Sequence, residues 1–227
     1  MKKSLFWVVI GIFFLAGCSS LPPQQNVTLE SGVWDKKPKI GVYINPTPKI
    51  TTSFPGANCL LCFAAAALAN SSLTKQVETF QPDQLASLRD NVVARLQEKG
   101  VEVVVIEKLI PESKLPKVKA TALSTLKRHY GPYKKQYGVD QLLVINYRAG
   151  VDRSYSSYIP MGEPLVVISG QFYMIDLHTN QYTMYDPLSI SIGAEGEWDA
   201  PPTFPGITNA FYQAEEAAVD HVMAPLN

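Results

Sequence analysis

The chain has 227 residues, of which 46% are hydrophobic and 18% are charged. This balance is typical of a domain with a hydrophobic core and excludes a chain that stays disordered for lack of apolar residues. The 20 basic and 20 acidic residues give no net charge, and no nucleic-acid recognition motif accompanies the basic residues, so nucleic acid is not an expected partner.

The first residues have the pattern of an export signal. Lys2 and Lys3 precede an apolar run over residues 5–16, which is too short to span a bilayer as a stable helix. The run ends in Leu15-Ala16-Gly17-Cys18, which resembles the lipobox of bacterial lipoproteins. The resemblance implies cleavage before Cys18 and acylation of its thiol and new amino group, and two or three acyl chains anchor a protein durably. The alternative is an ordinary signal peptide with an incidental cysteine.

The resemblance also implies a location in the cell envelope. Inner-membrane retention in lipoproteins usually needs Asp after the acylated cysteine, and Ser19 stands there instead. We therefore expect an outer-membrane lipoprotein that faces the periplasm. The expected organisation is a signal peptide over residues 1–17, a polar, proline-bearing tether over 18–36, and one periplasmic domain over 37–227.

In the first half of the domain, the sequence predicts a strand, a helix and a second strand. Residues 39–45 lie between two prolines, and their side chains alternate in polarity, which predicts a strand. Residues 81–99 predict a helix, with Pro82 in its first turn and Gly100 at its end. Residues 101–106 are β-branched and apolar and predict a buried strand. The helix carries one apolar stripe, formed by Leu85, Leu88, Val92 and Leu96.

The second half predicts a basic helix over residues 117–130, with Val118, Ala122, Leu126 and Tyr130 facing inward, and an apolar strand over 138–147. A hairpin is predicted over residues 165–177 and 181–192, and Pro187 is expected at an edge or bulge. Tyr182, Met184, Leu188, Ile190 and Ile192 are expected on one side of its second strand. A last helix over 209–223 follows Thr208 as a possible N-cap.

This order of elements predicts an α/β (α+β) fold, in which helices pack on a mixed sheet that ends in an antiparallel hairpin. Residues 88–108, 138–144 and 169–180 resemble the lipoproteins whose folded part is like the N-terminal domain of TolB, a group that includes the curli secretion lipoprotein. Many of these proteins carry an Asp-x-x-Thr-Gly turn, and residues 176–180 match it with Asn180 in place of Gly. The resemblance implies a fold and protein–protein binding, and it implies neither a reaction nor a pore.

Cys59-Leu60-Leu61-Cys62 is the one constellation that favours an enzymatic reading. A thiol at a helix N-terminus has a lowered pKa, as in thiol–disulfide oxidoreductases, and Asn58 could cap such a helix. The apolar Leu-Leu pair opposes that shift. We expect a structural disulfide or two buried thiols, because two cysteines supply only half of a tetrahedral metal site.

Residues 59–69 are apolar on every side of a helix, which is typical of a buried core helix. The alternative is a membrane-contacting or subunit-contacting segment over residues 55–72, as in a pore-forming oligomer. Such a helix would span about half of a bilayer core.

The charges are unevenly distributed. Glu195, Glu197 and Asp199 alternate in a loop that could hold Ca²⁺, although a solvated loop is expected. The acidic loop 193–199 and the tyrosine-bearing loop 153–160 are candidate interaction surfaces, and so is a basic surface within residues 114–135. Its members are Lys114, Lys117, Lys119, Lys127, Arg128, Lys134 and Lys135.

No motif of a hydrolase, metalloprotease or phosphate-binding loop occurs. The three histidines, His129, His178 and His221, are scattered along the chain, without a plausible nucleophile beside them. We therefore expect a non-catalytic protein without cofactor or metal, which acts as an accessory or assembly factor. Its expected partners are the membrane, through its lipid, and another envelope protein or further copies of itself.

Overall fold

The structure is a computed structural model that describes residues 23–120 and 126–227. The predicted lipidation site Cys18 and the predicted helical residue Ala122 lie outside the described residues. A mixed sheet dominates the described chain, with β1 parallel to its neighbours and β4 antiparallel to β7. Its strands are β1 (Lys39–Ile44), β2 (Thr51–Ser53), β3 (Glu102–Val105), β4 (Gln141–Asp152), β7 (Leu165–Asp176), β8 (Gln181–Tyr185) and β9 (Ser189–Gly193). The order across the sheet is β3-β1-β4-β7-β8, and β2 pairs with β4 while β9 pairs with β7.

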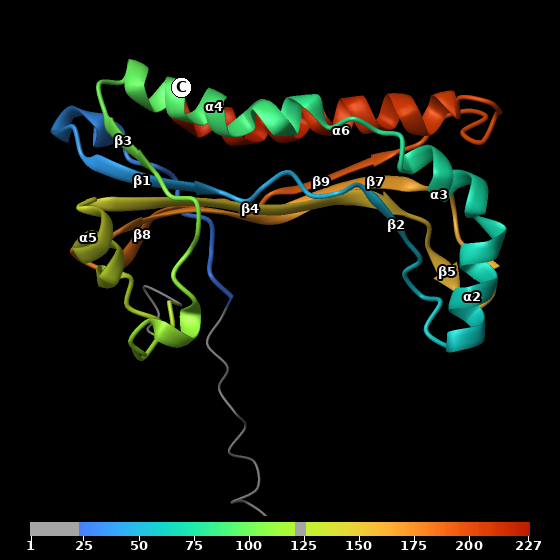
Figure 1. Ribbon diagram of the computed structural model, residues 1–227, viewed down its shortest axis with the longest axis horizontal. Helices are drawn as coiled ribbons and strands as arrows, with labels where there is room; N and C mark the ends of the chain where they lie inside the picture. Colours follow the sequence, from blue (N-terminus) through green and yellow to red (C-terminus); the bar gives the residue numbers. More distant parts are fainter. Residues whose placement is uncertain (1–22, 121–125) are drawn as a thin grey trace, which may run out of the picture.

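Two long helices cover one face of this sheet. α4 (Asp83–Glu98) and α6 (Pro205–Met223) lie side by side above the strands (Figure 1). The predicted stripe Leu85, Leu88, Val92 and Leu96 is buried against the sheet and belongs to the main core. The α+β class and the mixed sheet with its antiparallel pair are confirmed.

The other face carries two structures that hang from opposite ends of the sheet (Figure 1). At one end lie α5 (Gly131–Tyr137) and a segment that we call the basic lobe, the described part of residues 107–130. It contains the 3-10 helix Glu112–Lys114, and a second core formed by Leu115, Leu126, Tyr133 and neighbouring apolar side chains joins it to the sheet.

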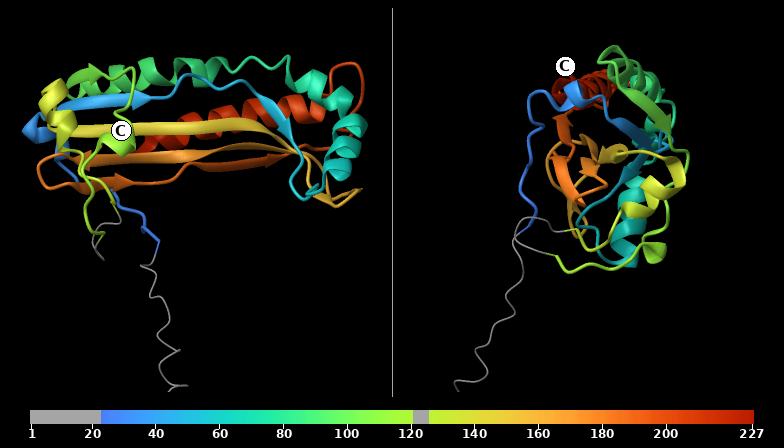
Figure 2. Two further views of the ribbon diagram at one scale, coloured as in Figure 1. Left: turned by 60° about the horizontal axis from the view of Figure 1, so that its bottom comes forward. Right: turned by 90° about the vertical axis from the view of Figure 1, so that its left-hand side faces the viewer.

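At the other end, β2, β4 and β7 curve away from the helices and lead into a second projection (Figures 1 and 2). We call it the arm: residues 54–70 and 154–162. It contains α2 (Leu60–Ala69) and a small hairpin of β5 (Tyr155–Ser156) and β6 (Ile159–Pro160), and α3 (Ser71–Val77) connects it to the body.

The predicted helix over residues 117–130 is wrong. Among its described residues, Lys117 instead pairs with Arg128 in an antiparallel bridge, and the Tyr130 N–H donates to the Asn180 side chain at 2.8 Å. The described backbone groups of this segment thus bond across the segment itself and to Asn180, 50 residues away from Tyr130, and a local periodicity cannot reveal such bonds. The helix of this region, α5, begins later, where Gly131-Pro132 supplies proline in the first turn.

The C-terminal elements need smaller corrections. The second strand of the predicted hairpin is divided into β8 and β9, with Pro187 between them. Because the register shifts at Met174 and Ile175, Tyr182 packs in the second core while Met184 and Leu188 are buried in the main one. α6 begins at Pro205 rather than 209, so Thr208 is not its N-cap.

Candidate functional site: an exposed apolar arm

The arm helix begins at the cysteine pair. Cys59 is the N-cap of α2, and its Sγ accepts the Cys62 N–H at 2.9 Å, whereas the prediction named Asn58. Cys59 and Cys62 are joined by a disulfide, as one of the structural alternatives expected. Cys59 is exposed and Cys62 is buried. The disulfide therefore links the solvent-exposed N-terminus of α2 to the interior of the arm.

The arm has a small core of its own. Ala57, Cys62, Ala66 and Tyr155 are buried together, with Phe54 packed against them. The Asn70 side-chain amide donates to the Tyr155 hydroxyl at 2.6 Å and to the Ala66 carbonyl at 2.7 Å. These contacts join α2 to the hairpin, although the two segments are far apart in the sequence.

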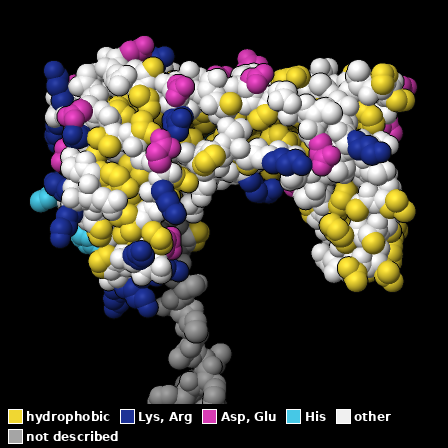
Figure 3. Space-filling model, viewed as in Figure 1, with side chains coloured by type: hydrophobic (Ala, Val, Ile, Leu, Met, Phe, Trp, Pro, Cys, Tyr) yellow, Lys and Arg dark blue, Asp and Glu magenta, His cyan; other side chains and the backbone are white. Residues whose placement is uncertain are grey.

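The outer surface of the arm is apolar. The buried core helix predicted over residues 59–69 is wrong, because only Cys62 and Ala66 of α2 are buried. Leu60 is 84% exposed, Leu61 71% and Leu68 77%. Figure 3 shows the resulting apolar surface at the end of the arm. The large apolar side chains exposed on the described part of the arm are Leu60, Leu61, Phe63 and Leu68 from α2, and Tyr158, Ile159 and Met161 from the hairpin region.

This surface contains no charge. No Asp, Glu, Lys or Arg occurs in the sequence between Lys49 and Lys75, or between Arg153 and Glu163. Arg153 and Glu163 form an ion pair at 3.8 Å where the hairpin leaves the body, and the Arg153 guanidinium also lies 5.3 Å from the centre of the Trp198 ring. Contiguous apolar surface that ends at polar residues marks a contact with a protein or a membrane.

The predicted basic residues lie at the opposite end of the molecule from the arm. Lys114, Lys117, Lys119 and Lys127 are exposed on the basic lobe, and Figure 3 shows basic side chains at its lower end. Lys134 and Lys135 lie on α5, where Lys134 pairs with Asp140 at 3.4 Å. Arg128 has a structural role, because it donates to the Leu115 carbonyl at 3.3 Å.

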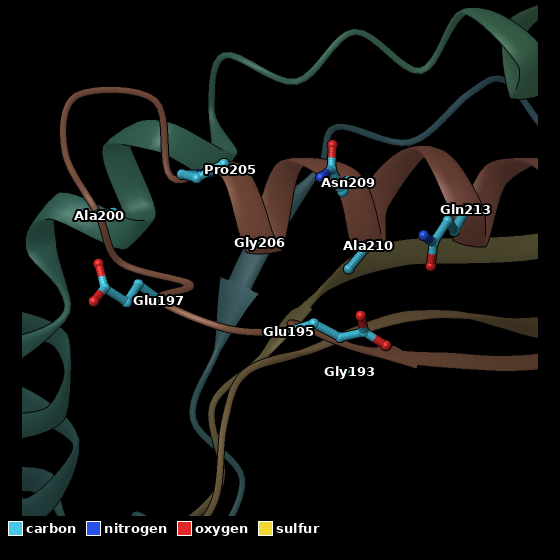
Figure 4. Close-up of a pocket in the computed structure, with 9 residues that line it drawn as sticks. All are labelled: Gly193, Glu195, Glu197, Ala200, Pro205, Gly206, Asn209, Ala210 and Gln213. Atoms are coloured by element: carbon cyan, nitrogen blue, oxygen red, sulfur yellow. The ribbon is translucent and has the colours of Figure 1, made fainter.

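The acidic loop lines a pocket of about 310 Å³ at the start of α6. Glu195 and Glu197 border it together with Asn209 and Gln213. Figure 4 shows the two carboxylates pointing in different directions, and Asp199 borders a separate pocket beside Asn70 and Trp198. The structure therefore does not bring these three carboxylates to one point.

The histidines have local contacts. His129 Nδ1 accepts the Gly131 N–H at 3.0 Å, the His178 N–H donates to Asp176 in the turn, and His221 lies 3.2 Å from Asp186. Across residues 23–120 and 126–227, no group of three or more His, Cys, Asp or Glu could hold a metal ion. No helix in the same ranges is long and apolar enough to cross a membrane.

The sequence identified both halves of the arm separately, as the apolar segment 55–72 and the tyrosine-bearing loop 153–160. It did not indicate that they meet. Met161, one residue beyond the predicted loop, was missed as a member of the site, although the lack of charge between Arg153 and Glu163 could have pointed to it.

Comparison with known proteins assigns no family, because no protein-family model and no curated protein matches the chain. A PelC dodecamer from Paraburkholderia phytofirmans aligns over 90% of this chain and 96% of its own, with 10% identity and a TM-score of 0.32. A putative neuraminyllactose-binding hemagglutinin homolog from Helicobacter pylori aligns over 91% and 94%, with 12% identity and a TM-score of 0.30. The hypothetical protein CT253 from Chlamydia trachomatis aligns over 82% and 99%, with 10% identity and a TM-score of 0.30. Similarities this low say nothing about the function of this chain.

Proposed function

We propose that this protein is a lipid-anchored, non-catalytic protein of a bacterial cell envelope, and that the arm is its main contact site. The observation that carries the proposal is the set of large apolar side chains exposed on the arm. Leaving such a surface in water is unfavourable, so a partner that covers it gains the hydrophobic free energy. An accessory or assembly factor that works by contact needs such a surface and no catalytic group.

The lipobox over residues 15–18 supports the anchor, and Ser19 supports the outer membrane as its place, with the domain in the periplasm. Growth of the native host with radioactive palmitate tests this part. The wild-type protein should carry the label and fractionate with the outer membrane, whereas Cys18→Ala should carry none. A wild-type protein without label, or found in the cytosol, would contradict the proposal.

Crosslinking in cells tests the contact site. A photoreactive amino acid at Leu61 should form adducts, with a lipid, another envelope protein or a second copy of this chain. The matched control is the same residue at Tyr212, which is 49% exposed on α6. Equal adduct yields at the two positions would contradict the assignment of the arm as the contact site.

A thiol–disulfide exchange activity is the second candidate, because Cys59 is exposed at the start of α2 and bonded to Cys62. The hydroxyl of Tyr158 lies 3.6 Å from Cys59 Sγ. Titration of the pair in glutathione redox buffers tests this candidate, since a redox enzyme must exchange its disulfide readily. A pair that stays oxidised throughout the buffer range would exclude the candidate.

A further inference from the structure

We infer that the arm seats in the surface of the bilayer that holds the acyl anchor, with the basic lobe as a second contact on the same bilayer. The inference rests on the proposed lipid anchor and names the partner of the arm. Its four supports are the direction from which the chain enters the domain, the chemistry of the arm tip, the length of α2, and the charge of the basic lobe.

The entry of the chain limits how far the bilayer can be. Val27 exchanges two backbone hydrogen bonds with Tyr185 on β8, each 2.9 Å long, so the chain is fixed to the sheet there. Val27 stands nine positions after Cys18, and an extended chain of this length reaches at most about 30 Å. The described segment 23–26 lies on the side of the sheet from which the arm projects, away from α4 and α6 (Figures 1 and 2). An acylated Cys18 therefore holds that side toward its bilayer.

The tip of the arm has the chemistry of an interfacial anchor. Its exposed side chains are leucines, a phenylalanine, an isoleucine and a methionine, with Tyr158 as an aromatic residue that carries a polar group. Side chains of this kind occur where a protein enters the boundary between headgroups and acyl chains. The tip contains no Lys, Arg, Asp or Glu that would have to leave water.

The length of α2 fits a surface contact and not a pore. Its ten residues extend about 15 Å, which is half of a hydrocarbon core of about 30 Å. The helix can enter one leaflet, and it cannot reach the other side. The hairpin packed against it is shorter still.

The basic lobe adds a contact of a different kind. It projects from the same face of the sheet as the arm (Figure 1), and Figure 3 shows the hollow between the two projections. Lys114, Lys117 and Lys119 are exposed on it, and its acidic residues are Glu107 and Glu112. Such a surface is attracted to anionic headgroups over a distance of about one Debye length. The molecule thus presents an apolar and a basic contact on the side where its chain begins.

Depth-dependent fluorescence quenching tests the inference on the complete, acylated protein in vesicles that contain phosphatidylglycerol. In the mature protein Cys18 is acylated and Cys59 is bonded to Cys62, so a new cysteine is the sole free thiol. A nitrobenzoxadiazole probe on Ile159→Cys should be quenched at least twofold more than the same probe on Tyr212→Cys by lipids with a nitroxide near the headgroup. Equal quenching at the two positions would overturn the inference.

Charge variants sharpen the test. Leu60→Glu combined with Leu61→Glu, both at exposed positions, should lower the quenching at Ile159 to the level of Tyr212. The matched control adds the same two charges on α6, as Asn209→Glu with Gln213→Glu, and should leave the quenching at Ile159 unchanged. Neutralising Lys114, Lys117 and Lys119 to Gln should remove the dependence of quenching on the phosphatidylglycerol content. Full quenching in the Leu60/Leu61 variant would overturn the role of the arm, and an unchanged lipid dependence would overturn that of the lobe.

Failure of the bilayer inference can be distinguished from failure of the proposed function. The mass of the purified protein reports the acyl chains by themselves, and their absence would contradict the proposed function. An acylated protein that shows no quenching at Ile159, and whose Leu61 crosslinks to a protein in cells, would overturn the bilayer as the partner and leave the proposed function standing.

Discussion

The Asn70 amide and the Tyr155 hydroxyl form a buried hydrogen bond of 2.6 Å that joins the end of α2 to the first strand of the hairpin. Both side chains are nearly inaccessible to solvent. A buried polar group without a partner is costly, so this bond favours the arrangement in which both apolar segments lie together. The arm therefore exposes one combined surface rather than two separate loops.

Tyr155→Phe should loosen the arm by about 1 kcal/mol, because it removes one buried hydrogen bond while Asn70 keeps its bond to Ala66. Hydrogen exchange of the α2 amides measures this loss. Tyr212→Phe is the control, since this tyrosine lies outside the arm and is 49% exposed, and surface changes cost less than about 0.5 kcal/mol. Equal exchange in the two variants would show that the buried bond does not hold the arm.

Gly56→Ala should destabilise the arm more than Gly162→Ala. Both glycines have positive φ, so alanine is strained at either position. A methyl group at Gly56 would also overlap the carbonyl oxygen of Tyr155, whereas one at Gly162 would meet no atom within 4 Å in the described structure. Thermal unfolding and exchange of the arm amides measure the difference, which should exceed about 1 kcal/mol. Equal losses would contradict the close packing of residues 54–58 on the hairpin.

Reduction of the Cys59–Cys62 disulfide should loosen the start of α2 by no more than about 2 kcal/mol, because the bond closes a loop of only four residues. The double variant Cys59→Ser with Cys62→Ser should reproduce the effect and no longer respond to dithiothreitol. Its serine at 59 can still cap the helix. Exchange of the α2 amides gives the measurement, and identical exchange with and without reductant in the wild type would show that the bond is not structural.

Glu215 should make the protein less stable as the pH rises above about 4.5, the ordinary pKa of its carboxyl. Burial raises the pKa of Glu215, and the backbone N–H groups of Leu85 and Gln84 offset this only in part. Between the ordinary and the raised pKa the folded state binds more protons than the unfolded state, so the free energy of unfolding falls with pH.

Glu215→Gln removes this loss, so the wild type should become less stable relative to the variant from pH 4.5 upward. Urea unfolding at several pH values measures both proteins. Glu216→Gln, at the exposed neighbouring position, should keep the pH dependence of the wild type. A constant difference between wild type and Glu215→Gln across this range would contradict the prediction.

The sequence predicted the elements whose burial follows a regular period. The stripe from Leu85 to Leu96 and the apolar strands are local patterns, so the class of the fold and the main helix over Asp83–Glu98 could be recognised. The segment 117–130 has helical spacing too, but its backbone bonds to Asn180 and to itself across a bridge. Long-range bonds of this kind leave no periodic signal.

The candidate site could be predicted only in pieces. Residues 59–69 carry no polar stripe, and a helix without one is usually buried. The arm lies beyond the two long helices, so within residues 23–120 and 126–227 no helix or strand covers the outer side of α2 (Figure 1). Its exposure follows from the topology, in which β4 and β7 continue past the body, and not from the composition of the segment itself.

β4 and β7 pair over twelve residues each, a continuous ladder about 40 Å long. This ladder has the basic lobe near one end and, past its curved end, the arm at the other (Figure 1). Because a hydrogen-bonded ribbon resists bending, the spacing of the two projections is set by the number of strand residues. In the membrane-bound orientation that we propose, contacts at both ends of this ladder would keep the domain from rotating about its anchor, and the outer surfaces of α4 and α6 would face away from the bilayer.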